Sequence, residues 1–199
     1  MSRYILITGA NGSLGSCAVL HMARSFQGNH FILAVRNTAD EKSKNLARDL
    51  TELSTPFTFM KLDLTSVQAV NSFVGDVIDR IKKGCFPKLS VIINCAAYQT
   101  FTYQVPTEDG FDPVLQTNYL SPFLLTTKCL GILEEDGRII NIGTAAHKLG
   151  TVSYFSNPKQ QEIRTGKMGL KDALSCYGSS KLMLTMFGFE LQRRLVAVC

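Results

Sequence analysis

Several features are scarce or absent in this sequence of 199 residues, and each absence narrows what the chain can be. It has no tryptophan, three histidines and six prolines. No apolar run approaches the roughly 18 residues that a membrane-crossing helix needs. The first run, Tyr4–Ile7, is also too short for the core of a signal peptide. We therefore expect neither a membrane span nor a secretory signal.

The composition that is present is that of a globular protein. Hydrophobic residues make up 45% of the chain and charged residues 19%, which excludes disorder as the main state. The length predicts one domain, over residues 1–199, with a core of its own. The net charge of +5 is scattered, and its densest pairs are Arg193-Arg194 and Lys82-Lys83. Because no basic stripe forms, we expect no nucleic-acid partner.

The six cysteines indicate the compartment. None are spaced C-x-x-C and no histidine stands at finger spacing, so we predict no metal site. Cys95 lies in an apolar, strand-like run and Cys17 in a helix-like one, which favours free thiols in a reducing compartment. The glycosylation-like triplet Asn11–Ser13 falls inside a glycine-rich loop, where a glycan has no room. These features predict a cytoplasmic protein.

Short apolar runs alternate with longer segments of helical spacing. The predicted strands are Tyr4–Thr8, Phe31–Arg36, Phe57–Leu62, Leu89–Cys95 and Arg138–Thr144. The predicted helices are Leu14–Ser25, Glu41–Leu53, Ser66–Lys83, Phe111–Leu133 and Tyr177–Val198. Continuous apolar strands suit a parallel sheet that is covered on both faces. The alternation therefore predicts an α/β fold with a doubly wound sheet in three layers, the Rossmann type. Residues 148–175, rich in glycine and polar side chains, are predicted to form a long loop that has room for a helical turn.

A glycine-rich segment joins the first predicted strand to the first predicted helix. Glycines at this junction let the backbone turn tightly and approach a pyrophosphate, while the helix N-terminus offers free N–H groups. A glycine trio alone also fits an ordinary turn, but its place at the first strand-to-helix junction favours nucleotide binding. The predicted nucleotide-binding residues of this segment are Thr8, Gly9, Asn11, Gly12, Ser13, Leu14 and Gly15.

Arg36 ends the second predicted strand, where the residue type distinguishes the two nicotinamide cofactors. An acidic residue there binds the ribose hydroxyls of NAD, whereas a basic one accommodates the 2′-phosphate of NADP. The alternative is that Arg36 only closes the strand at the surface. The position favours NADP over NAD.

Tyr177 and Lys181 are four residues apart in a predicted helix, so they share one face. A free tyrosine has a pKa of ~10, and moving its proton at neutral pH costs roughly 4 kcal/mol. A neighbouring ammonium favours the phenolate and lowers that cost. The pair by itself also occurs by chance on helices.

Together with other segments, this pair resembles the short-chain dehydrogenase/reductase family. The segments that carry the resemblance are Thr8–Gly15, Asn94–Ala97, Asn118, Asn141–His147 and Tyr177 with Lys181, in order along residues 3–196. The stretches 117–126 and 137–147, and the long spacing from Thr144 to Tyr177, are most similar to retinol-dehydrogenase-type members.

The resemblance implies a role for each matching residue. Tyr177 would be the general acid/base, and Lys181 would bind the nicotinamide ribose and tune Tyr177. Thr144 would orient the substrate oxygen, and Asn118 would support a proton-relay water. The remaining implied positions are Asp63 near the adenine, Asn94 linking the fourth strand to its neighbour, and Ala96 beside the cofactor.

The sequence departs from the family pattern at two places that bear on function. Thr144 stands where the family usually has serine; it keeps a hydroxyl, but its methyl group stiffens and crowds the site. Ser13 replaces a usual glycine, so Gly9, Gly12 and Gly15 are evenly spaced, as in the family's extended branch. These departures leave open an impaired, cofactor-binding or interaction protein, and an extended-type enzyme acting on a nucleotide sugar.

The implied function is an NADP(H)-dependent oxidoreductase that interconverts a lipophilic alcohol with an aldehyde or ketone. The family also suggests a homodimer through the helix Tyr177–Val198. Compared with the family, the chain stops at Cys199 soon after the catalytic helix. We therefore expect it to lack the last strands and the substrate-binding segment, and to be weakly stable or to oligomerise.

Overall fold

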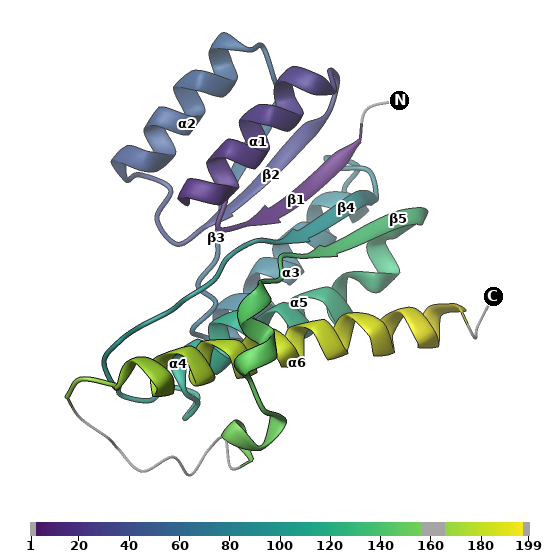
Figure 1. The fold of residues 1–199 in the computed structure, drawn as a ribbon. Coiled ribbons are helices and arrows are strands. Elements are labelled where there is room, and N and C mark those ends of the chain that lie inside the picture. The colour runs from purple at the N-terminus through teal and green to yellow at the C-terminus, as the bar shows by residue number, and fades with distance from the viewer. Residues whose placement is uncertain (1–2, 157–165, 197–199) are drawn as a thin grey trace. The chain divides into compact units, whose positions relative to one another are not determined.

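The computed structural model of the protein describes residues 3–156 and 166–196. The strands are β1 (Tyr4–Thr8), β2 (His30–Val35), β3 (Phe57–Lys61), β4 (Leu89–Asn94) and β5 (Leu133–Asn141). They form one sheet in the order β3-β2-β1-β4-β5 (Figure 1). Strand β1 pairs in parallel with β2 and β4, and β2 with β3. The order reverses direction at β1, which confirms the predicted doubly wound α/β fold.

Helices and short helical turns connect the strands. The α-helices are α1 (Ser13–Ser25), α2 (Glu41–Glu52), α3 (Val67–Lys82), α4 (Pro113–Leu115), α5 (Ser121–Cys129) and α6 (Leu170–Val196). A π-helical turn, η1 (Gln116–Leu120), lies between α4 and α5, and the 3₁₀ turns are η2 (Leu130–Ile132), η3 (Ala145–Leu149) and η4 (Val152–Phe155). None of the described helices combines the length and the apolarity needed to cross a membrane.

The internal contacts divide the chain into two compact units. The first comprises Met1–Asp63, Gln68–Ala96 and Leu125–Ile140, and it holds the sheet, α1, α2 and most of α3. The second comprises Leu64–Val67, Ala97–Leu124 and Asn141–Cys199, and it holds α4, η1, η3, η4 and α6. That residues 1–199 form a single domain stays a prediction.

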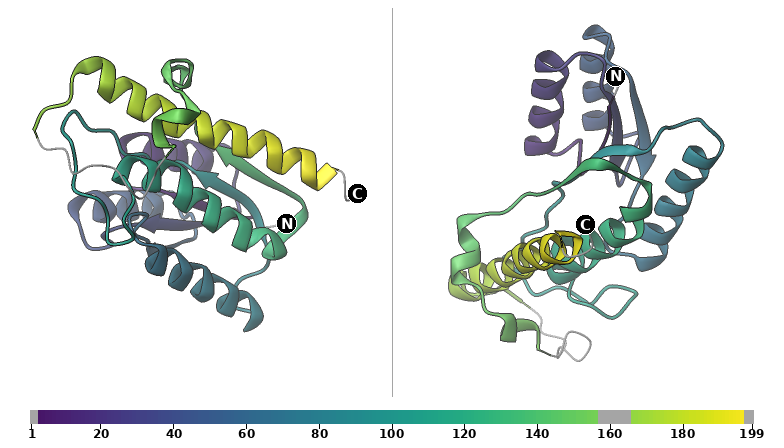
Figure 2. Two further views of the ribbon diagram at one scale, coloured as in Figure 1. Left: turned by 90° about the horizontal axis from the view of Figure 1, so that it is seen from below. Right: turned by 90° about the vertical axis from the view of Figure 1, so that its right-hand side faces the viewer.

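The core of the first unit lies in the central strands. Every residue of β2 from Phe31 to Val35 is buried, as are Ile5 to Thr8 of β1. This continuous burial is expected of parallel strands covered on both faces. Helices α1 and α2 lie side by side on one face of the sheet and α3 lies on the other (Figure 1; Figure 2, right). The predicted bounds of β1 to β4 and α1 to α3 agree with the structure to within one residue.

Helix α6 organises the second unit. It packs against η1, η3 and η4, and it buries small residues along that side. A Cβ atom added to Gly178 would lie 2.4 Å from the carbonyl oxygen of Ala146, and one added to Gly150 would lie 2.4 Å from the carbonyl carbon of Gly178. The turn η3 and the residue after it therefore pack directly against the backbone of α6, and only glycine fits at these two positions.

The prediction for the start of α6 was wrong. The sequence predicted a helix from Tyr177, but the helix begins at Leu170. The helical turn allowed for within the predicted loop 148–175 is present as η4. Ala173 N–H donates to the carbonyl oxygen of Gly169, and Asp172 lies in the first turn, where a carboxylate favours the helix dipole. Part of that predicted loop, residues 157–165, lies outside the described residues.

Two further predicted bounds need correction. The helix predicted over Phe111–Leu133 is divided into α4, η1, α5 and η2, with the π-helical turn at its centre. The strand predicted over Arg138–Thr144 is β5, which begins earlier, at Leu133, and ends at Asn141. The 3₁₀ turn η2 ends the helix, and Leu133 adopts extended backbone angles. Thr144 therefore lies beyond the strand.

Candidate active site

At two positions of the glycine-rich turn, close backbone contacts within the chain leave no room for a side chain. Gly9 has a φ of +66°, and a Cβ atom there would lie 2.8 Å from the Cα atom of Ala96. A Cβ atom at Gly15 would lie 2.3 Å from the carbonyl oxygen of Gly9. Gly12 differs, because its nearest neighbour would be 3.2 Å away and its φ is ordinary. No close contact within the chain therefore requires glycine at position 12. Its lack of a side chain instead leaves the backbone accessible to a ligand.

The turn leads directly into the N-terminus of α1. Gly12 is the N-cap, and no side chain caps this helix end in the described part of the chain. Ser13 and Leu14 are exposed, while Gly15 is buried. Uncapped N–H groups and the positive end of the helix dipole suit an anionic group such as a phosphate.

Thr8 and Asn94 hold the ends of the central strands. The hydroxyl oxygen of Thr8 accepts hydrogen bonds from the backbone N–H groups of Cys95 and Ala96, each at 3.1 Å. Asn94 is buried, and its Nδ2 donates to the hydroxyl oxygen of Thr126 on α5 at 3.0 Å. Thr8 thus fastens the end of β4 to β1. Asp63, half-buried, follows β3 at the same end of the sheet.

Asn11 and Arg36 differ in how far their side chains are engaged. The Asn11 amide Nδ2 lies 3.3 and 3.2 Å from the two carboxylate oxygens of Asp40 and 3.0 Å from the hydroxyl oxygen of Ser43. Arg36 is exposed and makes no hydrogen bond or ion pair with any described residue. The amide of Asn11 is therefore committed to the chain, whereas the charge of Arg36 is available to a ligand.

Tyr177 and Lys181 lie one turn apart on α6, in the second unit. Tyr177 is half-buried, and burial raises the pKa of its phenol. Lys181 is only 1% exposed, and its Nζ donates to the carbonyl oxygen of Ile142 at 2.9 Å. That Lys181 tunes Tyr177 stays a prediction. In this structure desolvation dominates, and the phenol is held more firmly in its protonated form.

Asn118 is held by a clamp that the sequence did not reveal. This fully buried residue lies in η1; its Oδ1 accepts from Tyr98 N–H at 2.7 Å, and its Nδ2 donates to the Tyr98 carbonyl oxygen at 2.8 Å. The same Nδ2 donates to the Ser180 hydroxyl oxygen at 3.0 Å, and that hydroxyl donates to the carbonyl oxygen of Tyr177 at 2.7 Å. Ser180 thereby links Asn118 to the backbone of Tyr177.

Thr144 is the N-cap of η3. Its hydroxyl oxygen accepts from Ala146 N–H at 3.3 Å. Its carbonyl oxygen accepts from the His147 backbone N–H at 3.2 Å and lies 2.6 Å from His147 Nδ1. Ile142, which binds Lys181, lies two residues before Thr144. Within the second unit, hydrogen bonds therefore link Asn118 to Tyr177 through Ser180, and they link Lys181 to Ile142. Thr144 shares no hydrogen bond with these residues in the described part of the chain, but it follows Ile142 closely in the sequence.

The comparison with family models decides the membership of this chain. Residues 3–156 match the model of the short chain dehydrogenase family. The chain belongs to the short-chain dehydrogenase family. That family is one of oxidoreductases, so the predicted resemblance is confirmed.

The curated relatives are similar along nearly the whole chain. Retinol dehydrogenase 13 of Mus musculus is 31% identical over 197 residues, covering 97% of this chain and 54% of the relative. Polyprenol dehydrogenase of Homo sapiens is 30% identical over 203 residues, covering 98% of this chain and 56% of the relative. The chain thus spans about half the length of the curated relatives it matches.

Solved structures of other short-chain dehydrogenases share the fold. NADPH-bound carbonyl reductase from chicken fatty liver superposes with a TM-score of 0.66 at 21% identity, covering 93% of this chain and 71% of that structure. NAD⁺-bound xylitol dehydrogenase superposes with a TM-score of 0.68 at 21% identity, covering 98% of this chain and 65% of that structure. At this identity the likeness shows the fold alone.

Sequence reasoning missed the residues that support this short-chain dehydrogenase site. Ser180 directly precedes Lys181, and its hydroxyl was a visible signal. Gly178 follows Tyr177, and a glycine in a helix interior usually indicates a close contact. Tyr98 carried no signal, because it uses its backbone groups to hold Asn118.

Proposed function

We propose that the chain is an NADP(H)-dependent oxidoreductase that interconverts a lipophilic alcohol with its aldehyde or ketone, using Tyr177 as general acid/base. The observation that carries the proposal is the hydrogen bonding in the second unit, where Ser180 links Asn118 to Tyr177 and Lys181 binds Ile142, two residues before Thr144. Family membership supports oxidoreductase chemistry.

The residues at the C-terminal ends of β1 to β4 fit a dinucleotide. The turn from Gly9 to Gly15 and the uncapped N-terminus of α1 would hold the pyrophosphate. Asp63 and Ala96 would flank the nucleoside parts, and Lys181 would bind the nicotinamide ribose. When bound, the nicotinamide supplies or accepts the hydride of the reaction. NADP is favoured by the exposed and unengaged guanidinium of Arg36.

Tyr177 supplies the proton for reduction. Because burial raises the pKa of its phenol, Tyr177 stays protonated at neutral pH. As the carbonyl carbon gains a hydride, its oxygen gains negative charge and takes this proton. Thr144 would orient that oxygen, and Asn118 would hold the water that returns the proton. In oxidation the same groups act in the reverse order.

An apolar cluster beside Tyr177 supports a lipophilic substrate. Its buried members are Val114, Leu115, Phe155 and Cys176. Half-buried side chains pack against them, namely Tyr98, Tyr119, Leu120, Tyr154, Met168, Tyr177 and Met183. Tyr177 therefore packs against the same apolar cluster as several aromatic and thioether side chains, and such surroundings favour a substrate with an apolar body.

A turnover assay tests the proposed reaction. The purified chain is incubated with NADPH and a panel of aliphatic, aromatic and isoprenoid aldehydes and ketones, and NADPH loss is followed by absorbance. We expect turnover on at least one lipophilic carbonyl. No turnover with any carbonyl, while NADPH binding persists, would reject the enzymatic proposal and favour the catalytically impaired alternative.

Thr144 is the observation that favours that second candidate, a cofactor-binding protein of impaired activity. Its hydroxyl oxygen already accepts a hydrogen bond from Ala146 N–H, and its β-methyl restricts the rotamer. If Thr144 limits catalysis, Thr144→Ser raises turnover severalfold without changing NADPH affinity. The extended-branch chemistry on a nucleotide sugar rests on glycine spacing alone and has no supporting contact.

We also propose a homodimer that forms through α6, which covers the described part of the predicted helix Tyr177–Val198. The side chains of Met186 and Phe189 are 50% and 76% exposed on this helix. Two large apolar side chains one turn apart favour association over exposure to water.

A further inference from the structure

The loop between β2 and α2 carries two opposite charges. Arg36 directly follows β2 and is exposed, with no ion pair or hydrogen bond to any described residue. Asp40 is the N-cap of α2, at the other end of the same loop. Asn37 braces the loop between them: its Oδ1 accepts from Ala39 N–H at 2.9 Å, and its carbonyl oxygen accepts from the Ser43 hydroxyl at 2.8 Å.

The Asp40 carboxylate is fixed against the glycine-rich turn. Asn11, in that turn, donates to Asp40 Oδ1 at 3.3 Å and to Oδ2 at 3.2 Å. Ser43 N–H donates to Oδ1 at 2.8 Å. These hydrogen bonds, that from Ser43 first, lower the pKa of Asp40, so the group is ionised at neutral pH. A full negative charge thus stays within hydrogen-bond distance of a residue of the turn.

The two charges make opposite demands on a bound dinucleotide. In a doubly wound fold the adenosine ribose lies between the glycine-rich turn and the end of the second strand. A cation there attracts the 2′-phosphate of NADP, and a carboxylate accepts a hydrogen bond from the free 2′-hydroxyl of NAD. Asp40 Oδ2 accepts one hydrogen bond in the structure and has a lone pair left for a hydroxyl. A phosphate near the same carboxylate meets charge repulsion.

We propose that Asp40 is a specificity-determining residue that opposes Arg36, so that NAD(H) remains a competitive coenzyme although the strand-end residue is basic. The inference rests on the proposed binding of a dinucleotide at the glycine-rich turn. It deepens that proposal by assigning coenzyme choice to the balance of two residues on one loop.

The chain offers a matched pair of variants. Asp40→Asn removes the charge but keeps an oxygen that accepts from Ser43 N–H, and asparagine is as good an N-cap as aspartate, so α2 stays capped. Glu41→Gln removes the same charge from the next residue, whose side chain is exposed and makes no hydrogen bond with Asn11 in the described structure. A long-range charge effect alone would act alike in both variants.

The experiment measures dissociation constants of NADPH and NADH by nicotinamide fluorescence for the wild type and both variants. Competition by adenosine 2′,5′-bisphosphate against 5′-AMP isolates the 2′-phosphate. We expect Asp40→Asn to shift the affinity ratio toward NADPH on the order of tenfold, and to shift the competitor ratio likewise. We expect Glu41→Gln to shift the NADPH/NADH affinity ratio less than about twofold, since the charge of an exposed side chain is screened by salt.

The outcomes separate the role of Asp40 from the proposed binding of the coenzyme. Equal shifts in both variants, or no shift in Asp40→Asn while the coenzymes still bind, would overturn the role of Asp40 and leave the proposed function intact. Failure of the wild type to bind either coenzyme would overturn both. A circular-dichroism melt of each variant confirms that it is folded.

Discussion

The three glycines of the glycine-rich turn differ in the contacts that an added Cβ atom would make. Gly9 and Gly15 face backbone atoms at distances that no Cβ tolerates, whereas Gly12 does not. The spacing in the sequence predicts that all three matter, but it cannot separate their reasons. The reason at Gly9 depends on the position of Ala96, which follows β4 and lies 87 residues further along the chain (96 − 9).

We predict that Gly9→Ala destabilises the fold and that Gly12→Ala leaves it largely intact. At Gly9 a side chain meets both a left-handed φ and the Cα atom of Ala96, and the left-handed region alone costs about 1–2 kcal/mol. At Gly12 the neighbour need give only a few tenths of an ångström. Urea denaturation measures the difference in unfolding free energy. Equal losses in the two variants would contradict this account.

The contact between Asn11 and Asp40 could not be predicted from the local sequence. Asp40 before Glu41 carries the signal of an N-cap, and the helix does begin there. The amide that binds Asp40 belongs to a residue 29 positions earlier. Only the parallel pairing of β1 with β2 brings the two loops to the same end of the sheet.

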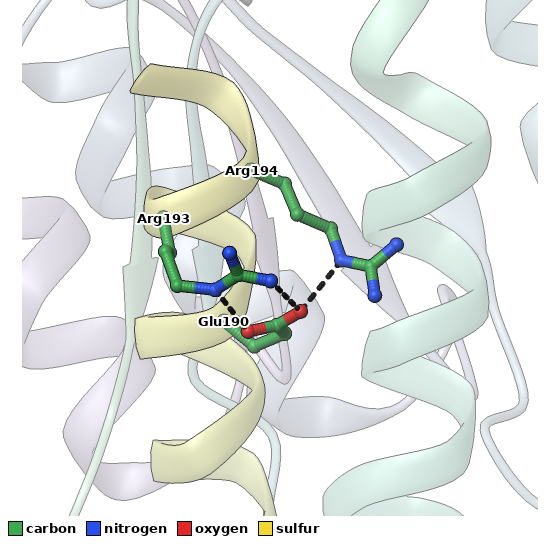
Figure 3. Close-up of polar contacts among 3 residues, drawn as sticks. All are labelled: Glu190, Arg193 and Arg194. Atoms are coloured by element: carbon green, nitrogen blue, oxygen red, sulfur yellow. Dashed lines mark hydrogen bonds and ion pairs between the residues drawn. The ribbon is translucent and has the colours of Figure 1, made fainter. Parts of the chain in front are cut away.

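Among the elements, α6 departs most from its predicted bounds. Its first six residues, 170–175, were assigned to a loop because that segment is rich in glycine and polar side chains. Its outer face near the C-terminal end carries Glu190, which binds Arg193 and Arg194 at 2.7–2.8 Å (Figure 3). These arginines lower the pKa of Glu190 to about 2. Because all three side chains are solvent-accessible, the ion pairs mark an outer surface and contribute little to stability.

We predict that Gly178→Ala in α6 impairs turnover, whereas Gly75→Ala in α3 does not. The new Cβ would lie 2.4 Å from the carbonyl oxygen of Ala146 and would push away the turn that Thr144 caps. Gly75→Ala on α3 is the control, because nothing lies within 4 Å of its Cβ, and alanine there gains up to about 1 kcal/mol of helix propensity. The measurement pairs kcat with a thermal melt. Full turnover in Gly178→Ala would contradict the proposed packing.

A histidine at the other end of the sheet couples stability to pH. His30 begins β2, stacks on Tyr4 at 4.5 Å and places Nε2 2.9 Å from the Thr58 hydroxyl oxygen. Phe86 packs against the same ring, and Arg80 lies over Phe86. Burial lowers the pKa of His30 below its ordinary value of 6.5.

We predict that stability falls as the pH drops below about 6.5. In that window the unfolded chain takes up the proton and the folded His30 resists it, so unfolding is favoured. His30→Phe keeps an aromatic ring for the stack but removes the titratable imidazole. The part of the pH dependence that is due to His30 therefore disappears. His21→Phe is the control, since His21 is exposed. Melting temperatures at pH 7.5 and 5.5 decide; an unchanged pH difference in His30→Phe would refute the assignment.

At the scale of the whole molecule, the strands follow from the hydrophobic pattern of the sequence. The contacts within the second unit depend instead on tertiary packing. Continuous apolar runs predict the central strands and their parallel pairing, and four of the five strands agree with the structure to within one residue. The links through Ser180, Tyr98 and Gly178 depend on how separate segments pack. A one-dimensional pattern identifies Tyr177 and Lys181 but not the backbone groups that hold them.

We predict that the protein associates through α6. Phe189 is 76% exposed, and Phe189→Ser is expected to shift a dimer toward the monomer in sedimentation velocity. Phe26→Ser is the matched control, because Phe26 follows α1 and is 60% exposed. A monomeric wild type, or an equal shift in both variants, would argue against this interface.

The most direct test of the central claim compares Tyr177→Phe with the wild type in NADPH-linked carbonyl reduction, with NADPH binding measured in parallel. Tyr119→Phe is the control, because Tyr119 is another half-buried phenol of the same apolar cluster. The account predicts that Tyr177→Phe loses at least about a hundredfold in turnover and keeps its NADPH affinity, while Tyr119→Phe retains turnover. Unchanged turnover in Tyr177→Phe would contradict the account.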